Sequence, residues 1–257
     1  MRPITALGLF SLIPVPPQEI DRKAASGAMT AMPFVGLLLG ALAGAVVWAG
    51  AAVGTAWVGA LGGLAVLAAL TGGLHLDGVA DTADGLGSRK PATEALAVMK
   101  QSDIGPMGVI TMVLVLLLQA GAIVDLTTAY APLQAGAAVA LATAVGRTGC
   151  LFASRGPSAR PGGFGALVAG APSGFAVAAN AVGVLLLAGA LGWWVSDGVG
   201  AAALTGAVAC AYAVGYGWAR HVIRRLGGST GDVFGSVIEI TQTAALVGLA
   251  VAGHALA

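Results

Sequence analysis

The sequence is short of charged residues. Only 9% of its 257 residues are Asp, Glu, Lys or Arg, while 58% are hydrophobic and the mean hydropathy is +0.92. A typical soluble domain has about 25% charged residues, because its surface must be hydrated. The composition therefore excludes a single soluble domain. The net charge of +1 also gives no electrostatic support for binding nucleic acid.

Cysteine is scarce as well. The two cysteines, Cys150 and Cys210, lie in apolar segments without the short spacing of metal-binding pairs. We expect both to be buried as small hydrophobic side chains. The first residues, MRPITALGLFSLIPVPP, contain a short apolar run that ends in prolines and lacks a small-residue cleavage site. They predict a short interfacial helix or a re-entrant segment that stays on the protein, not a cleaved signal peptide.

Long apolar segments and glycine are abundant. Segments of about 20 residues with almost no charge are long enough to cross a bilayer as helices. The 41 glycines suit membrane helices, whose backbones approach closely at small residues. The sequence predicts an all-α, polytopic integral membrane protein that forms one membrane domain over residues 1–257. The predicted transmembrane helices, seven in number, are 31–51, 56–74, 105–124, 131–152, 174–195, 199–219 and 233–254.

The basic residues predict the orientation, because cytoplasmic loops collect Lys and Arg. With the N-terminus in the cytoplasm, the outer loops near 52–55, 125–130 and 196–198 contain no Lys or Arg. The polar motifs then lie on the inner side, in loops 75–104 and 220–232. We therefore predict an active site at the cytoplasmic face.

The segment HLDGVADTADGL, residues 75–86, concentrates acidic residues. Asp77, Asp81 and Asp84 have the spacing i, i+4, i+7, which places them on one face of a helix. We call these three residues the aspartate stripe. Like charges at this spacing repel each other, and Mg²⁺, which binds carboxylates, phosphates and water, would remove the repulsion. The stripe predicts a Mg²⁺ site for a diphosphate. The alternative is a solvated helix start, where the helix dipole favours acids.

A second polar stripe occurs in GGSTGDVFGSVIEIT, where Asp232, Ser236 and Glu239 have the same spacing. An acidic residue at the centre of a membrane helix costs about 2.5–3.5 kcal/mol, so it usually faces a polar interior. We expect Asp232 and Glu239 to complete the same substrate site. The alternative for Glu239 is a structural hydrogen bond to a neighbouring helix.

Basic residues and one histidine extend the candidate site. Cations beside a metal-bound carboxylate suit the oxygens of a diphosphate. The candidates for substrate binding are Lys100, Arg147, Arg220 and Arg224. For Arg220 and Arg224 the alternative is anchoring at the inner membrane surface. His75 is a candidate metal ligand, proton carrier or interfacial histidine.

Together these motifs resemble the cobalamin synthase family. The resemblance rests on HLDGVADTADGL, MKQSDIGPMGV and GGSTGDVFGSVIE, with weaker support from IPVP and PFVGLLLGAL. It extends from residue 10 to about residue 242. Ser11 and Leu12 stand where a Thr-Arg pair is expected, so no basic role is assigned there. Asp103 is not always an acid in that motif.

The resemblance implies a Mg²⁺-dependent enzyme of the bacterial cytoplasmic (inner) membrane that acts late in cobalamin (vitamin B12) biosynthesis. Adenosylcobinamide-GDP would donate cobinamide phosphate to α-ribazole, or to its 5′-phosphate, and GMP would leave. Asp77, Asp81 and Asp84 would bind the metal. Asp84 and His75 are the candidates for catalytic proton transfer. The lipid bilayer is a further partner, and a homo-oligomer or contacts with other enzymes of the pathway stay open.

Three other functions fit parts of the pattern. A CDP-alcohol phosphotransferase would share the opening Asp77-Gly78-Val79-Ala80, but Asp81 stands where that family has Arg, and its later acidic motif is missing. A prenyl-diphosphate transferase would carry D-D-x-x-D. An ion-coupled transporter would use Asp77, Asp81 and Glu239 as cation sites, yet transporters usually place such acids near the midplane within repeated halves.

Overall fold

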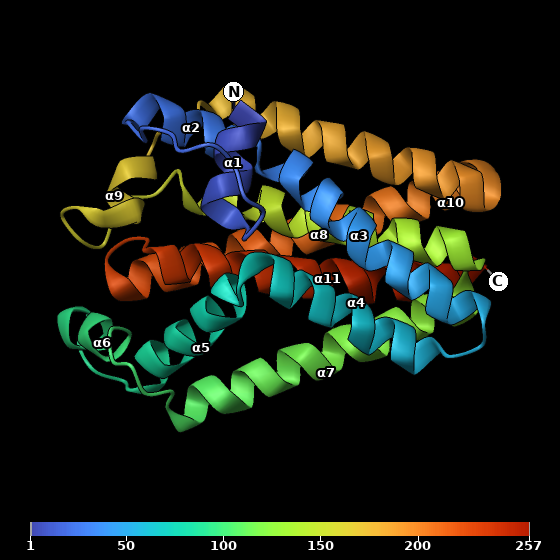
Figure 1. The fold of residues 1–257 in the computed structure, drawn as a ribbon, viewed down its shortest axis with the longest axis horizontal. Helices are drawn as coiled ribbons and strands as arrows, with labels where there is room; N and C mark the ends of the chain where they lie inside the picture. The colour runs from blue at the N-terminus through green and yellow to red at the C-terminus, as the bar shows by residue number, and fades with distance from the viewer. Residues whose placement is uncertain (1, 257) are drawn as a thin grey trace.

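The computed structural model describes residues 2–256. The regular elements in that range are all helices. In chain order the helices are α1 (Arg2–Phe10), α2 (Arg22–Thr30), α3 (Met32–Ala52), α4 (Ala56–Thr71), α5 (Leu74–Gly87), α6 (Ala92–Val98), α7 (Pro106–Ala129), α8 (Pro132–Ala153), α9 (Gly163–Val168), α10 (Gly174–Leu226) and α11 (Gly231–Leu256). The all-α prediction is confirmed, and the long helices run side by side along one axis (Figure 1).

Five helices in this range are long and apolar enough to cross a membrane, namely α3, α7, α8, α10 and α11. Helix α4 has 16 residues and meets that criterion only together with α5, from which it is bent by 89°. The described chain thus has five or six candidate spans. This confirms the polytopic class but does not confirm the predicted number of seven.

Helix α10 explains part of the difference between the predicted seven spans and the five or six candidates. It is counted as one span, although its 53 residues include a break. Ser196 and Asp197 have non-helical dihedral angles. A β-carbon added to Gly192 would lie 2.2 Å from the carbonyl oxygen of Gly200, and one added to Gly189 would lie 3.3 Å from the Thr205 hydroxyl. Because residues 16 positions apart lie side by side, α10 folds back on itself into two antiparallel arms. These arms coincide with two of the predicted segments.

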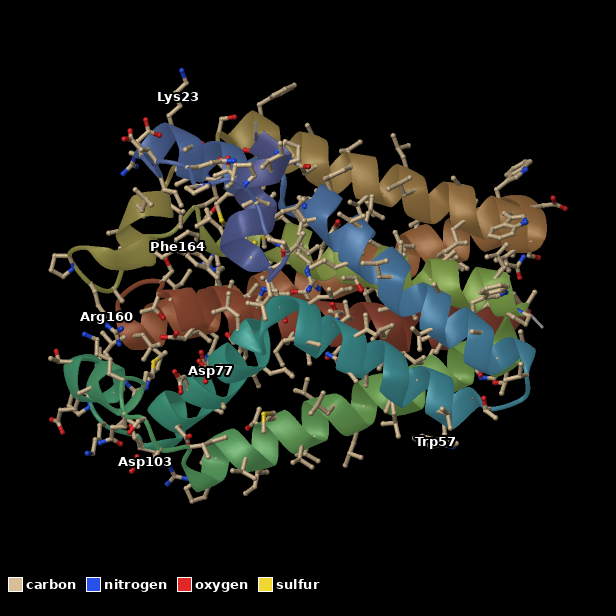
Figure 2. All side chains as sticks on the ribbon, viewed as in Figure 1. Lys23, Trp57, Asp77, Asp103, Arg160 and Phe164 are labelled. Carbon is tan, nitrogen blue, oxygen red and sulfur yellow. The ribbon has the colours of Figure 1, made fainter. Side chains whose placement is uncertain are left out.

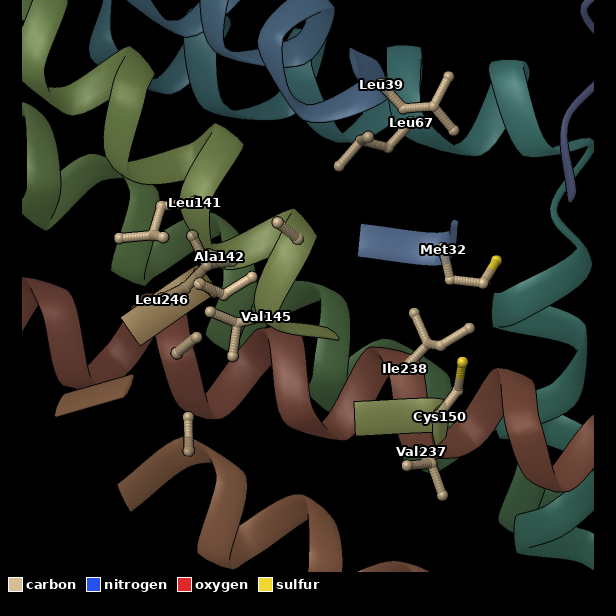
Figure 3. Close-up of a cluster of buried hydrophobic side chains, with 14 of the residues drawn as sticks. Met32, Leu39, Leu67, Leu141, Ala142, Val145, Cys150, Val237, Ile238 and Leu246 are labelled. Atoms are coloured by element: carbon tan, nitrogen blue, oxygen red, sulfur yellow. The ribbon is translucent and has the colours of Figure 1, made fainter. Parts of the chain in front are cut away.

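Helix α8 lies at the centre of the bundle, against α3, α10 and α11. Every residue from 141 to 151 is buried. Gly44 of α3 allows the closest approach, because a β-carbon there would lie 2.2 Å from the carbonyl oxygen of Gly136. Beside these backbone contacts, apolar side chains of α8 and α11 fill the core, including Val145, Ile238 and Leu246 (Figure 3).

The bend between α4 and α5 follows from two glycines. Gly72 and Gly73 have φ angles of +61° and +72°, a left-handed conformation that residues with a β-carbon rarely adopt. The apolar helix α4 ends there, and the chain turns into the polar helix α5. The 89° turn carries the aspartate stripe across the end of the bundle.

Charged side chains concentrate at one end of the molecule. Figure 2 shows Lys23, Asp77, Asp103 and Arg160 at that end, while Trp57 lies toward the other. This agrees with the predicted gathering of polar motifs on one side. The cytoplasmic orientation of that side stays a prediction.

The two cysteines behave differently. Cys150 is buried as expected, whereas Cys210 is exposed on α10. The expectation was wrong for Cys210 because an apolar membrane segment has an outer face as well as a core face.

We expect Gly44→Ala to lower the thermal stability of the purified protein by several degrees. Overpacking a close contact costs typically about 1–3 kcal/mol, and the backbone of Gly136 cannot move aside as a flexible side chain could. Thermal unfolding in lipid nanodiscs would measure the loss. Gly121→Ala is the matched control, because nothing lies within 4 Å of an added β-carbon there. An equal effect of the two substitutions would contradict the close packing of α3 and α8.

Labelling of single cysteines would test the orientation in a variant that lacks Cys150 and Cys210. Lys90→Cys and Pro157→Cys should react only from the cytoplasm, and Thr128→Cys only from outside, because the basic loops stay inside. All three side chains are exposed. Reaction of position 90 with an external reagent would contradict the predicted topology.

Candidate functional site

The aspartate stripe lies on α5, as the spacing predicts. Asp77 is exposed, while Asp81 and Asp84 are partly buried. The face of α5 adjacent to the stripe meets α11 backbone to backbone. A β-carbon added to Gly78 would lie 2.6 Å from the carbonyl oxygen of Asp232, and one added to Gly235 would lie 3.2 Å from the backbone of His75. These two glycines let the helices touch, which brings Asp232 next to the stripe.

The charges of the two helices act on Asp81. Helix α5 by itself is not a candidate span, and its acidic face lies at the polar end of the bundle. Partial burial, followed by the charges of Asp77 and Asp232, raises the pKa of the Asp81 carboxyl to about 6. The structure therefore brings Asp77, Asp81 and Asp232 into one electrostatically coupled group, which we call the acidic cluster.

Arg160 opposes this negative charge. It belongs to the loop between α8 and α9, and its charge lowers the pKa of Asp81 against the effects just described. Its guanidinium donates a hydrogen bond of 2.7 Å to the carbonyl of Leu96. Backbone hydrogen bonds hold the loop against the α10–α11 connection, from Ser229 to Pro157 (2.8 Å) and from Ala159 to Ser229 (3.0 Å). Sequence analysis missed Arg160, because no signal separates it from the other basic residues of the inner side.

Asp84 has a different environment from the other two aspartates. One carboxylate oxygen accepts a hydrogen bond from the Gly105 amide (2.7 Å), and the other accepts one from the Gly108 amide (2.8 Å). Gly105 is the N-cap of α7 and Gly108 lies in its first turn, where unpaired N–H groups favour an anion. Asp84 thus fastens α5 to α7. Its predicted roles as metal ligand and as base stay predictions, but its contacts favour a structural role.

The arrangement of possible ligand side chains bears on the predicted Mg²⁺ site. Within residues 2–256, no group of three or more His, Cys, Asp or Glu side chains is arranged to hold a metal ion. Mg²⁺, however, is commonly bound by one or two carboxylates together with substrate phosphates and water. The acidic cluster offers oxygen ligands of this kind, and their mutual repulsion would be relieved by a cation. The Mg²⁺ site stays a prediction.

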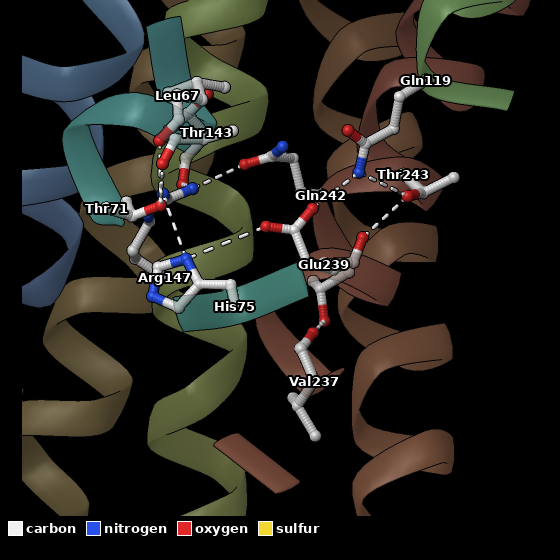
Figure 4. A network of polar contacts seen from close by, with 12 residues as sticks. Leu67, Thr71, His75, Gln119, Thr143, Arg147, Val237, Glu239, Gln242 and Thr243 are labelled. Carbon is white, nitrogen blue, oxygen red and sulfur yellow. Dashed lines mark hydrogen bonds and ion pairs between the residues drawn. The ribbon is translucent and has the colours of Figure 1, made fainter. Parts of the chain in front are cut away.

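A second group of polar side chains lies buried beneath the acidic cluster, and Figure 4 shows its contacts. The Arg147 guanidinium donates a hydrogen bond of 2.6 Å to the Gln242 side chain. It also lies 3.4 Å from Nδ1 of His75, which is 3.8 Å from the Glu239 carboxylate. Gln119 donates a hydrogen bond of 2.8 Å to the other Glu239 oxygen. This network connects α5, α7, α8 and α11.

The network changes the interpretation of three predicted site residues. Arg147, Glu239 and His75 are 1%, 6% and 3% exposed, and they contact one another, whereas the acidic cluster lies at the polar end of the bundle. The structure therefore gives Glu239 the interhelical hydrogen bond that was its alternative interpretation. Substrate binding by Arg147 and Glu239 stays a prediction.

The remaining basic candidates lie elsewhere. Lys100 is exposed after α6. Arg220 and Arg224 are on the second arm of α10 and line a separate cavity of about 270 Å³, together with Arg155 and Tyr216. Arg220 donates to the Tyr216 hydroxyl (3.2 Å) and Arg224 to the Arg220 carbonyl (3.2 Å). Neither arginine lines the two cavities that flank α5.

Two cavities flank α5. A cavity of about 710 Å³ includes Asp77 and Ala80 of α5, the end of α1 and Met112 of α7. A smaller cavity of about 200 Å³ includes His75 and Phe234. Leu9, Phe10 and Leu74 contribute to both. The larger volume lies within the range of about 300–1,000 Å³ that is usual for sites of drug-sized ligands, so a ligand group of that size has space beside Asp77.

Comparison with known proteins agrees with the motifs. A family model described as cobalamin-5-phosphate synthase matches residues 2–250. Three relatives are named adenosylcobinamide-GDP ribazoletransferase. The one from Frankia casuarinae is 38% identical over 96% of this chain and 93% of its own length. Those from a Nocardioides species and Brevibacillus brevis are 37% and 32% identical, over 94% of this chain and 95% and 94% of their own lengths.

No solved structure matches this chain. The family match covers nearly the whole of it, and the relatives align over almost their full lengths. The resemblance predicted from the aspartate stripe and the late motif is therefore confirmed. This chain belongs to the cobalamin-5-phosphate synthase family.

Proposed function

We propose that this chain is a membrane enzyme that transfers cobinamide phosphate from adenosylcobinamide-GDP to α-ribazole or its 5′-phosphate, with release of GMP. The relatives are named for this activity. The observation that carries the proposal is the convergence of Asp77, Asp81 and Asp232 from two helices next to a cavity of about 710 Å³ that Asp77 lines. The bacterial inner membrane is the proposed location.

The reaction is a displacement at phosphorus. A free ribose hydroxyl oxygen of the ribazole acceptor forms a bond to the phosphorus that carries cobinamide, its proton goes to a base, and the bond to GMP breaks. GMP leaves with the electron pair of that bond. Such a transfer depends mainly on positioning and on stabilising the charge of the phosphate oxygens.

The acidic cluster can stabilise the negative charge of phosphate oxygens only if it also holds cations. Asp77, Asp81 and Asp232 would hold Mg²⁺, which supplies positive charge to the diphosphate when bound. Asp77 lines the larger cavity, and we therefore place the diphosphate beside it. Arg160, whose charge already acts on the cluster, is available to bind a phosphate oxygen.

The base for the attacking hydroxyl was predicted to be Asp84 or His75. Both oxygens of Asp84 accept backbone amides, so using this carboxylate as a base would weaken the contact between α5 and α7. We propose that Asp84 positions α5, and that its loss acts on activity through the placement of Asp77 and Asp81.

Replacing Asp77, Asp81 or Asp232 by Asn should lower the rate of GMP release by about 10²–10³-fold, the effect typical of losing one group that stabilises the charge of a transition state. The measurement is GMP formation from adenosylcobinamide-GDP and α-ribazole in nanodiscs at saturating Mg²⁺. Asp125→Asn is the matched control, because Asp125 is exposed in a predicted outer loop. Near-normal activity of both Asp77→Asn and Asp81→Asn would contradict the proposed role of the cluster.

Asp84→Ala should lower thermal stability more than Asp77→Ala does. The substitution removes two hydrogen bonds to a charged acceptor, each worth about 1.5–3 kcal/mol, whereas Asp77 is exposed. Thermal unfolding in nanodiscs gives the comparison, and a Mg²⁺ titration of the remaining activity separates the two roles. If Asp84→Ala kept its stability but needed much more Mg²⁺, Asp84 would be a ligand and not a structural contact.

A further inference from the structure

The smaller cavity beside α5 has no role in the transfer described above. Its volume is about 200 Å³, below the range of about 300–1,000 Å³ for pockets that bury whole drug-sized ligands. It therefore has space for one ring system but not for a whole nucleotide. It also adjoins the larger cavity, since Leu9, Phe10 and Leu74 line both.

Aromatic side chains form much of its wall. The ring of Phe164 packs edge to face against Phe10, with centroids 5.5 Å apart, and against Phe234, with centroids 6.1 Å apart. The three rings come from α1, α9 and α11, which are distant in sequence. Aromatic rings bind other flat rings favourably in stacked or edge-to-face geometry. The cavity wall therefore suits a planar ligand.

His75 supplies one polar group. Among the described residues that line this cavity, it has the only polar side chain. It is 3% exposed, and its Nε2 has no hydrogen-bond partner. Figure 4 shows Nδ1 facing Arg147 and Glu239, with Nε2 on the side of the ring away from them.

The hydrogen-bond partner of Nδ1 determines whether Nε2 of His75 carries a proton and can act as a donor. Nδ1 lies 3.4 Å from the Arg147 guanidinium, which has only hydrogen-bond donors. Nδ1 must accept in that contact, because the Glu239 carboxylate at 3.8 Å is beyond hydrogen-bond distance. The neutral imidazole then carries its proton on Nε2. A buried donor without a partner costs free energy, and a ligand with one acceptor would remove that cost.

We propose that this cavity binds the base of the ribazole substrate, a benzimidazole-type bicyclic ring. The Nε2–H group of His75 donates to the ring nitrogen that does not carry the ribose, and Phe10, Phe164 and Phe234 enclose the ring. This inference rests on the proposed function. Guanine fits less well, since its several polar edges would have only one polar side chain to meet them. A lipid acyl chain would leave the His75 donor without a partner.

The position of the cavity is consistent with the transfer. Gly231 and Gly235 line it, and they flank Asp232 on α11. A base held here would direct its ribose toward the acidic cluster, where the diphosphate of the other substrate is placed. Binding of the base would thus orient a ribose hydroxyl for attack.

Two ligands and two variants test the proposal in nanodiscs. Wild-type protein should bind α-ribazole about tenfold or more tightly than an α-riboside whose base has carbon in place of the acceptor nitrogen, because the second ligand leaves the donor unpaired. Phe164→Ala should raise both Kd and KM for α-ribazole about three- to tenfold, the value of one aromatic contact, without changing KM for adenosylcobinamide-GDP. Equilibrium dialysis gives Kd, and GMP release gives KM.

Phe175→Ala is the matched control, since Phe175 is 84% exposed on α10. Equal affinity for the two ribosides, or equal effects of Phe164→Ala and Phe175→Ala on α-ribazole binding, would overturn the proposal even if GMP release proceeds normally. Absence of GMP release from wild-type protein would instead contradict the proposed function, and the dialysis result would still decide whether the cavity binds the base.

Discussion

The backbone contact between α5 and α11 determines where the chemical groups of this protein lie. Gly78 and Gly235 have no side chains to hold the helices apart, so a short polar helix at the end of the bundle lies directly on a membrane-spanning one. A β-carbon at Gly78 would meet the Asp232 backbone at 2.6 Å. Residues more than 150 positions apart in sequence become one acidic cluster through this contact.

The same contact creates an electrostatic problem. Bringing Asp232 to the aspartate stripe adds negative charge where Asp77 and Asp81 already repel each other, and partial burial together with these charges raises the pKa of the Asp81 carboxyl to about 6. Arg160 offsets part of the charge, and Asp84 holds α5 against α7 through two amides. The structure thus maintains an arrangement that repulsion alone would open. A cation and a diphosphate would complete it, which is why the repulsion is informative about function.

Sequence analysis predicted the helical segments because apolar length and glycine content follow directly from the bilayer. It predicted the aspartate stripe because helical periodicity places i, i+4 and i+7 together. Periodicity does not show which neighbour faces each residue, however. Asp84 lies on the same predicted helix face as Asp81, yet its partners are the amides of Gly105 and Gly108, which only the packing of α7 supplies.

Other differences have the same origin. Arg160 is positioned by a loop that another loop holds in place, and no local pattern encodes such a pairing. Cys210 is exposed because hydrophobicity does not distinguish the lipid-facing side of a membrane helix from its core side. Glu239 was expected to have a polar partner because it is an acid in a membrane helix. Gln119 is such a partner within the bundle, and the place of Glu239 at the substrate site stays a prediction.

The first helix connects these observations. It was expected to be a short interfacial helix, and it is a helix of nine residues whose end forms a wall common to both cavities through Leu9 and Phe10. The Leu12 amide donates a hydrogen bond of 2.7 Å to the carbonyl of Leu70 near the end of α4, which fixes that wall beside the bend into α5. If the larger cavity holds the diphosphate substrate and the smaller one holds the base, Leu9 and Phe10 would contact both substrates. A helix outside both acidic motifs would then contribute to the binding of each.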